Sequence, residues 1–169
     1  MISSIERRLI VQHRANEASK RLESIHGIGI IGASAIAATV TDPKAFRSGR
    51  DFAAWIGLVP RQDSTGGKPK LGPISKQGDR YLRRILVVGA HSVLRRAKQN
   101  PQKYPWLAQL LARRAFKVVA VALANKMARI AWALLASGGH YRPRLAAKRY
   151  GCSHVSGLLM QPFWLRALT

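Results

Sequence analysis

A long, mostly apolar segment in the second half of the chain restricts the folds that this sequence can adopt. It runs from Trp106 to Ala136, after Pro105 and before the glycines at 138 and 139. Proline suits the first turn of a helix, and glycine commonly ends one. The segment 112–136 is apolar around most of a helical circumference, interrupted only by Arg113, Arg114, Lys117, Asn125, Lys126 and Arg129. We therefore expect one helix that other helices surround, in an all-α fold.

Further segments also have helical patterns. Residues 2–22 place apolar side chains at coiled-coil-like spacing and then polar ones, which predicts a connector helix that packs on a partner at its start. Asp42-Pro43 begins a new segment in which Phe46, Phe52, Trp55 and Ile56 have the character of core residues.

The segment 79–98 predicts another helix. It begins at Asp79, a residue type that caps helix N-termini, and it carries an apolar stripe for burial. The predicted organisation is a connector helix over 1–22, a small helical domain over 23–140, and a basic tail over 141–169. We expect that tail to be partly disordered or to order on nucleic acid.

The charge of the chain indicates an anionic partner. Lysine and arginine number 29 against 7 acidic residues, a formal net charge of +22. Every acidic residue lies at or before Asp79, so the C-terminal half carries basic groups alone. Such an imbalance costs self-repulsion unless a polyanion neutralises it. Nucleic acid is the expected partner, although composition alone leaves DNA, RNA and anionic lipid open.

Other functional classes find little support in the residues. Cys152 is the single cysteine, so an intramolecular disulfide is excluded, and no Cys/His spacing indicates a metal site. The first ten residues lack a signal-peptide pattern, and the longest apolar run, Val118 to Ala124, is too short to span a bilayer. We expect a cytoplasmic, nucleoid-associated protein with no cofactor of its own and no membrane partner.

A Gly-Ile-Gly turn lies between two predicted helices. Gly27 and Gly29 break what would otherwise be one continuous helix from 23 to 40. One interpretation is a helix-hairpin-helix motif, which presents backbone N–H groups to a DNA phosphate beside a helix N-terminus. The other is a plain helix corner in which glycine only allows close packing. The residues do not decide between them.

A loop rich in glycine and lysine presents two hydroxyl groups. Ser64 and Thr65 precede two glycines that would let a polyanion approach the backbone closely. The loop and the helix after it supply further candidate nucleic-acid contacts, namely Gly66, Gly67, Lys68, Lys70, Ser75, Lys76, Arg80, Arg83 and Arg84. An ordinary turn and a solvated basic face are the alternative interpretations.

These motifs together resemble a known family. The ordered segments are Ile25 to Gly29, Phe46 to Lys68, Leu71 to Arg84 and Asn125 to Arg129. Their succession over residues 20–140 looks like the C-terminal domain of the bacterial insertion-sequence transposases of the one-ten and eleven-eleven family. The resemblance implies a whole protein with an RNase H-like domain that holds magnesium, a coiled coil, a structured guide RNA, and assembly into a homo-oligomer.

The same resemblance implies a serine nucleophile that forms a covalent phosphoserine link to DNA. It corresponds here to Ser64, or to Thr65, which stands directly before the glycine. We favour Ser64 because a primary alcohol is the less hindered nucleophile.

The seven acidic residues of the chain show no pattern of a metal-binding set. We therefore expect the serine-bearing part of a transposase, inactive without the carboxylate domain. A non-catalytic nucleic-acid-binding module and a regulatory transposase fragment remain alternatives.

Overall fold

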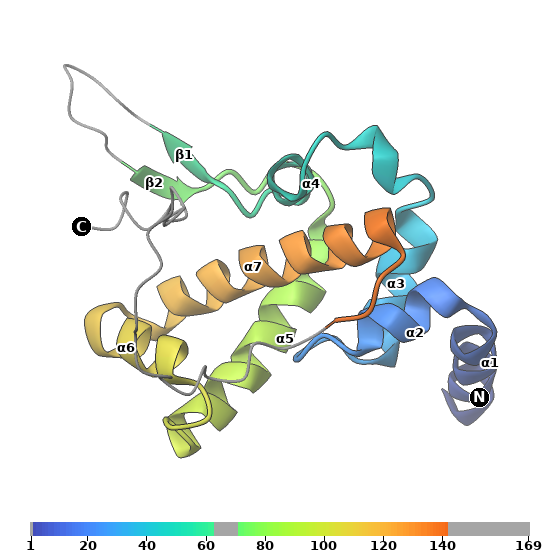
Figure 1. Cartoon of the computed structure of the whole chain (residues 1–169), viewed down its shortest axis with the longest axis horizontal. Coiled ribbons are helices and arrows are strands. Elements are labelled where there is room, and N and C mark those ends of the chain that lie inside the picture. Colours follow the sequence, from blue (N-terminus) through green and yellow to red (C-terminus); the bar gives the residue numbers. More distant parts are fainter. Residues whose placement is uncertain (1, 63–70, 142–169) are drawn as a thin grey trace, which may run out of the picture.

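The computed structural model describes residues 2–62 and 71–141, which form a mainly helical structure with one short hairpin (Figure 1). The prediction of a small all-α domain is confirmed apart from that hairpin. In chain order the elements are α1 (Ile2–Ala15), α2 (Glu17–Glu23), α3 (Ile30–Thr39), the 3-10 turn η1 (Pro43–Ala45), α4 (Gly49–Ile56), β1 (Pro60–Gln62), β2 (Leu71–Ile74), α5 (Arg80–Gln99), α6 (Pro105–Arg113) and α7 (Phe116–Ser137).

Helix α7 is the centre of the core. It lies across α5 and beside α4, and α2 and α6 also pack against it (Figure 1). Its buried face includes Val119, Ala120, Ala124 and Ala128, each without exposed surface. By length and composition α7 could also cross a membrane, but this core position already accounts for its apolar surface.

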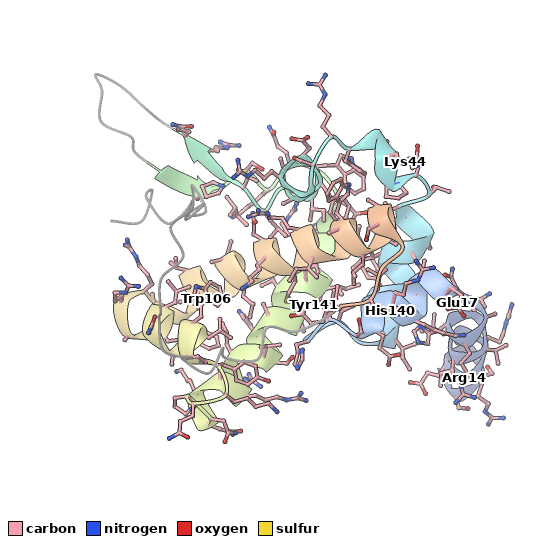
Figure 2. The ribbon with its side chains drawn as sticks, viewed as in Figure 1. Arg14, Glu17, Lys44, Trp106, His140 and Tyr141 are labelled. Atoms are coloured by element: carbon pink, nitrogen blue, oxygen red, sulfur yellow. The ribbon has the colours of Figure 1, made fainter. Side chains whose placement is uncertain are left out.

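The prediction of one helix over 106–136 is wrong in one respect. The chain leaves helical geometry at Arg114 and Ala115, so α6 and α7 are separate helices. The break lets α6 fold back, which buries Leu107 and places the Lys126 ammonium 4.2 Å from the centre of the Trp106 ring (Figure 2). At the other end Gly138 takes a left-handed conformation, φ 66°, as expected of a helix stop.

The predicted connector helix over 2–22 is also two helices. Asn16 leaves helical geometry, and its side chain accepts a hydrogen bond from the Ser19 N–H at 3.1 Å, so it caps α2. The bend brings the buried His13 ring 2.7 Å from the Ser19 hydroxyl and 2.9 Å from a Glu23 carboxylate oxygen. A polar network therefore fixes α1 to α2.

A two-stranded antiparallel hairpin stands where no strand was predicted. Pro60 pairs with Ile74 and Gln62 with Leu71, and the register is irregular between the two pairs. Each strand is only three or four residues long and contains a proline, so neither has the alternating pattern by which strands are recognised. The hairpin projects away from the helices (Figure 1).

The segment that follows Asp42-Pro43 covers one side of α7. Asp42 caps η1 through a 2.8 Å bond from the Lys44 N–H, and Trp132 of α7 donates its indole N–H to the Pro43 carbonyl at 2.9 Å. Phe52 is fully buried, as predicted, and stacks on Trp55, which keeps 40% of its surface exposed. Trp55 is therefore only partly a core residue.

Candidate nucleic-acid interface

The predicted nucleophile loop lies between the two strands of the hairpin. Ser64, Thr65, Gly66, Gly67, Lys68 and Lys70 fall outside the described residues. What the structure describes is the base from which that loop emerges, and the start of α5 beside it.

The base of the hairpin is a close junction between α4 and α5. Helix α4 ends at Gly57, which has φ 82°, and a Cβ there would overlap the Gln77 carbonyl oxygen. Gly78 has φ 90°, and a Cβ there would overlap the Trp55 carbonyl oxygen. Glycine is required at both positions because the two backbone segments touch.

Two predicted contact residues, Ser75 and Lys76, lie in this junction. The Ser75 N–H donates to the Val59 carbonyl at 2.9 Å, and the Lys76 N–H donates to the Gly57 carbonyl at 3.2 Å. Lys76 has φ 54°, an uncommon conformation for a residue with a side chain, while its side chain is exposed. The backbone of both residues is structural, and the Lys76 ammonium faces solvent.

The three arginines at the start of α5 have different surroundings. Asp79 caps the helix, as predicted, by accepting the Leu82 N–H at 2.8 Å. Arg83 is half-buried and donates from Nη1 to the carbonyls of Ile56, at 2.7 Å, and Gln77, at 3.3 Å. Arg80 and Arg84 are exposed and, with Tyr81, line a surface hollow of about 330 Å³. Arg83 thus joins the end of α4 to the segment before α5, while the other two arginines remain available to a ligand.

The two glycines of the Gly-Ile-Gly turn lie in different environments. Gly27 has φ 94°, and a Cβ there would lie 2.8 Å from both the Gly89 carbonyl oxygen and Val93 Cγ2 of α5. Close packing therefore accounts for glycine at position 27. Gly29 precedes α3, is exposed, and has open space around its Cα.

An apolar groove adjoins the arginine hollow. Its volume is about 700 Å³, and it lies between α1, the start of α3 and α5. The lining includes Gly29, Ile31, Tyr81, Arg84 and Val88. Arg84 and Tyr81 line both the hollow and the groove, so Gly29 and the two exposed arginines lie near one continuous surface.

Residues that could ligate a metal are dispersed over the described ranges. Within residues 2–62 and 71–141, no three histidine, cysteine, aspartate or glutamate side chains come together as a possible metal site.

Two residues of the site were not predicted from the sequence. Tyr81 is 55% exposed and lines the hollow with Arg80 and Arg84, so that in the sequence an aromatic residue is interleaved with basic ones. That alternation was a readable signal of nucleic-acid binding. Asn125 donates its Nδ2–H to the Leu58 carbonyl at 3.2 Å across 67 residues of sequence, a contact that no local pattern indicates.

Comparison with known proteins places this structure among transposases. The profile of the "Transposase IS116/IS110/IS902 family" matches residues 19–105, just over half of the chain. The chain belongs to this family. The family resemblance inferred from the motifs is thereby confirmed.

Curated relatives agree with that assignment. The protein of Sinorhizobium fredii named as transposase y4pF/y4sB is 52% identical over 143 residues, which cover 83% of this chain and 37% of the relative. The transposase for insertion sequence element IS1328 of Yersinia enterocolitica is 47% identical, over 81% of this chain and 41% of the relative. That for IS1111A of Coxiella burnetii is 43% identical, over 83% and 39%. The chain spans about two fifths of the length of these relatives.

Proposed function

We propose that this chain is the nucleic-acid-binding, serine-bearing part of an insertion-sequence transposase that acts on DNA. Membership of the family supports a role in transposition. The net charge of +22 supports binding to a polyanion, since backbone phosphates are the natural neutralising partner. Such a protein would act at the nucleoid in the cytoplasm.

The observation that carries the proposal is the surface at the start of α5. Arg80 and Arg84 are exposed there and line one hollow with Tyr81, and among the described residues neither arginine has a carboxylate within 4.0 Å. Guanidinium groups bind phosphate oxygens in a bidentate manner, and an exposed aromatic ring can stack on a base. Gly29 extends the same candidate surface through the adjoining groove. The exposed Lys76, four residues before Arg80, is a further candidate contact.

The proposed reaction uses a hydroxyl of the hairpin loop. The Ser64 oxygen attacks a DNA phosphorus atom, a P–O bond to deoxyribose breaks, and a phosphoserine ester forms. The serine proton passes to a base, and the leaving sugar oxygen takes up a proton. Thr65 is the second candidate for this role.

The remaining partners of the proposal come from outside the described residues. A magnesium-binding carboxylate domain and a guide RNA would act with this chain, and no step above is assigned to the metal.

Assembly with further copies would use α1, because Ile5 and Val11 are 62% and 65% exposed on it. Light scattering of the purified chain tests assembly, and a monomer at all concentrations would contradict it.

The test of the proposed function separates binding from chemistry. Binding of the chain to duplex DNA should weaken with salt at a log–log slope of roughly −0.9 per neutralised phosphate. Arg80→Gln and Arg84→Gln should each reduce the magnitude of that slope by roughly 0.9, the contribution of one phosphate contact. Arg47→Gln, at an exposed site before α4, serves as the matched control. Binding that does not change between low and physiological salt would refute the proposed interface.

The chemical step is tested in a protein that joins this chain to the N-terminal part of one of the longer relatives. There Ser64→Ala should abolish the covalent protein–DNA adduct and leave DNA affinity nearly unchanged, because one neutral hydroxyl adds little to a phosphate-dominated interface. An adduct that survives Ser64→Ala but is lost with Thr65→Ala would assign the nucleophile to Thr65.

A further inference from the structure

We propose that Arg83 and Asn125 are positioning residues that fix the direction in which the β1–β2 hairpin leaves the helical core. The inference rests on the proposed function, because its purpose is to place the loop that carries Ser64 and Thr65. The contacts themselves lie entirely within the described residues.

The first contact set holds the chain as it leaves α4. Arg83 Nη1 of α5 donates to the Ile56 carbonyl at 2.7 Å, and Asn125 Nδ2 of α7 donates to the Leu58 carbonyl at 3.2 Å. These two carbonyls flank Gly57, the left-handed residue at which α4 ends. The two longest helices of the core therefore each hold one side of the turn into β1.

The second contact set holds the chain as it returns. The same Arg83 nitrogen donates to the Gln77 carbonyl at 3.3 Å, just after β2. Backbone bonds from Ser75 to Val59 and from Lys76 to Gly57 close the base between these points. One guanidinium thus bridges the outgoing and returning segments of the hairpin.

Close packing around these bonds supports the base of the hairpin. The side chains of Ile56 and Leu58 are fully buried, with 0% and 1% exposure. The Gly57 and Gly78 backbones already touch Gln77 and Trp55. A hairpin anchored in this way keeps one direction relative to α5 and α7, which is what an attacking group on its loop requires.

Arg83 differs in this respect from its neighbours in sequence. Its guanidinium is half-buried and bonded to carbonyl oxygens, whereas Arg80 and Arg84 line the exposed hollow. Removal of Arg83 should therefore loosen the hairpin, and removal of Arg84 should weaken phosphate binding. The two residues, one position apart, form a matched pair.

The experiment measures the hairpin direction without reference to activity. Spin labels are placed on the whole chain at Gln62→Cys of β1 and Arg96→Cys of α5, both exposed, in a Cys152→Ser background. Their distance distribution should be narrow in the parent. Arg83→Met and Asn125→Asp should widen it to about twice the parent width or more, with helix content by circular dichroism unchanged, because only local contacts are lost. Arg84→Met should leave the width unchanged.

The conservative variants keep the test decisive if either replacement unfolds the chain. Arg83→Lys and Asn125→Gln retain a donor at an altered position, so each should stay folded and give a distribution moderately wider than that of the parent. A distribution that stays narrow in all four variants would overturn the proposal. The proposal would also be overturned if Arg83→Met, but not Arg84→Met, reduced the log–log salt slope of DNA binding by about one unit. Arg83 would then be the phosphate ligand.

Failure of the proposed function has a different signature. In that case the parent would bind DNA without salt dependence while the distance distribution still widened in Arg83→Met and Asn125→Asp. The distance distribution therefore tests the positioning role of the two side chains. The salt dependence of DNA binding separately tests the nucleic-acid role of the surface.

Discussion

Replacement of Gly89 by alanine should destabilise the chain, although helix propensity alone predicts the reverse. Gly89 lies in the interior of α5, where alanine is normally favoured by about 1 kcal/mol. A Cβ at this position would overlap the Gly27 carbonyl oxygen and lie 3.0 Å from the carbonyl carbon. Both are backbone atoms, so no rotamer change relieves the contact, and the turn before α3 must move away from α5.

The expected size of the effect follows from these two opposing contributions. Overpacking that forces a backbone shift costs typically about 1–3 kcal/mol, which exceeds the propensity gain of about 1 kcal/mol. The difference between the two is a net loss of up to about 2 kcal/mol, so we expect Gly89→Ala to lower the free energy of unfolding by up to that amount.

Urea denaturation followed by circular dichroism measures this change, with Val88→Ala as the matched control. Val88 is the next residue on the same helix and is 60% exposed, so its replacement should be neutral or slightly stabilising. A Gly89→Ala variant as stable as Val88→Ala would refute the close approach of Gly27 to α5.

Two further predictions concern the cap of α5 and the partly buried tyrosine after α7. Asp79→Ala should lower the free energy of unfolding by about 1 kcal/mol, because it removes the side-chain acceptor of the Leu82 N–H, and Asp79→Asn should retain most of the stability in the same urea assay. Burial next to Tyr104 raises the pKa of Tyr141 above its ordinary value, so the stability that it contributes is present below the pKa of the unfolded tyrosine and is lost as pH rises through the folded pKa. Absorbance titration at alkaline pH should show one late tyrosine that is missing in Tyr141→Phe, and a set of tyrosines that all titrate together would contradict it.

The sequence predicted those features that depend on neighbouring residues. The Asp79 cap, the start of a segment at Asp42-Pro43 and the stop at Gly138 each rest on a few residues in a row, and each is confirmed. The Asn16 cap was equally local, but the spacing of apolar and then polar residues over 2–22 led to the prediction of one continuous helix. Local chemistry was therefore a better guide there than periodicity.

Features that depend on distant partners could not be predicted in this way. The bond from Arg83 to Ile56 spans 27 residues and that from Asn125 to Leu58 spans 67. The sequence showed three equivalent arginines in the first turn of α5, and only the packing of α4 against α5 distinguishes Arg83 from the other two. The break between α6 and α7 likewise accompanies a tertiary contact, the burial of Leu107, that no local pattern indicates.

The arginines in the first turn of α5 lower the stability of the helix, and two of them are available to bind phosphate. Cations near a helix N-terminus oppose the helix dipole, and this turn carries three arginines against the single carboxylate of Asp79. Arg83 offsets part of that cost because its guanidinium bonds to Ile56 O, one of the last carbonyls of α4, where the dipole is negative. Arg80 and Arg84 have no such compensation among the described residues. A phosphate backbone bound to Arg80 and Arg84 would supply the compensating negative charge. It would bind at the same helical turn whose Arg83 anchors the hairpin. Binding of nucleic acid and placement of the candidate nucleophile loop would then act through one structural element.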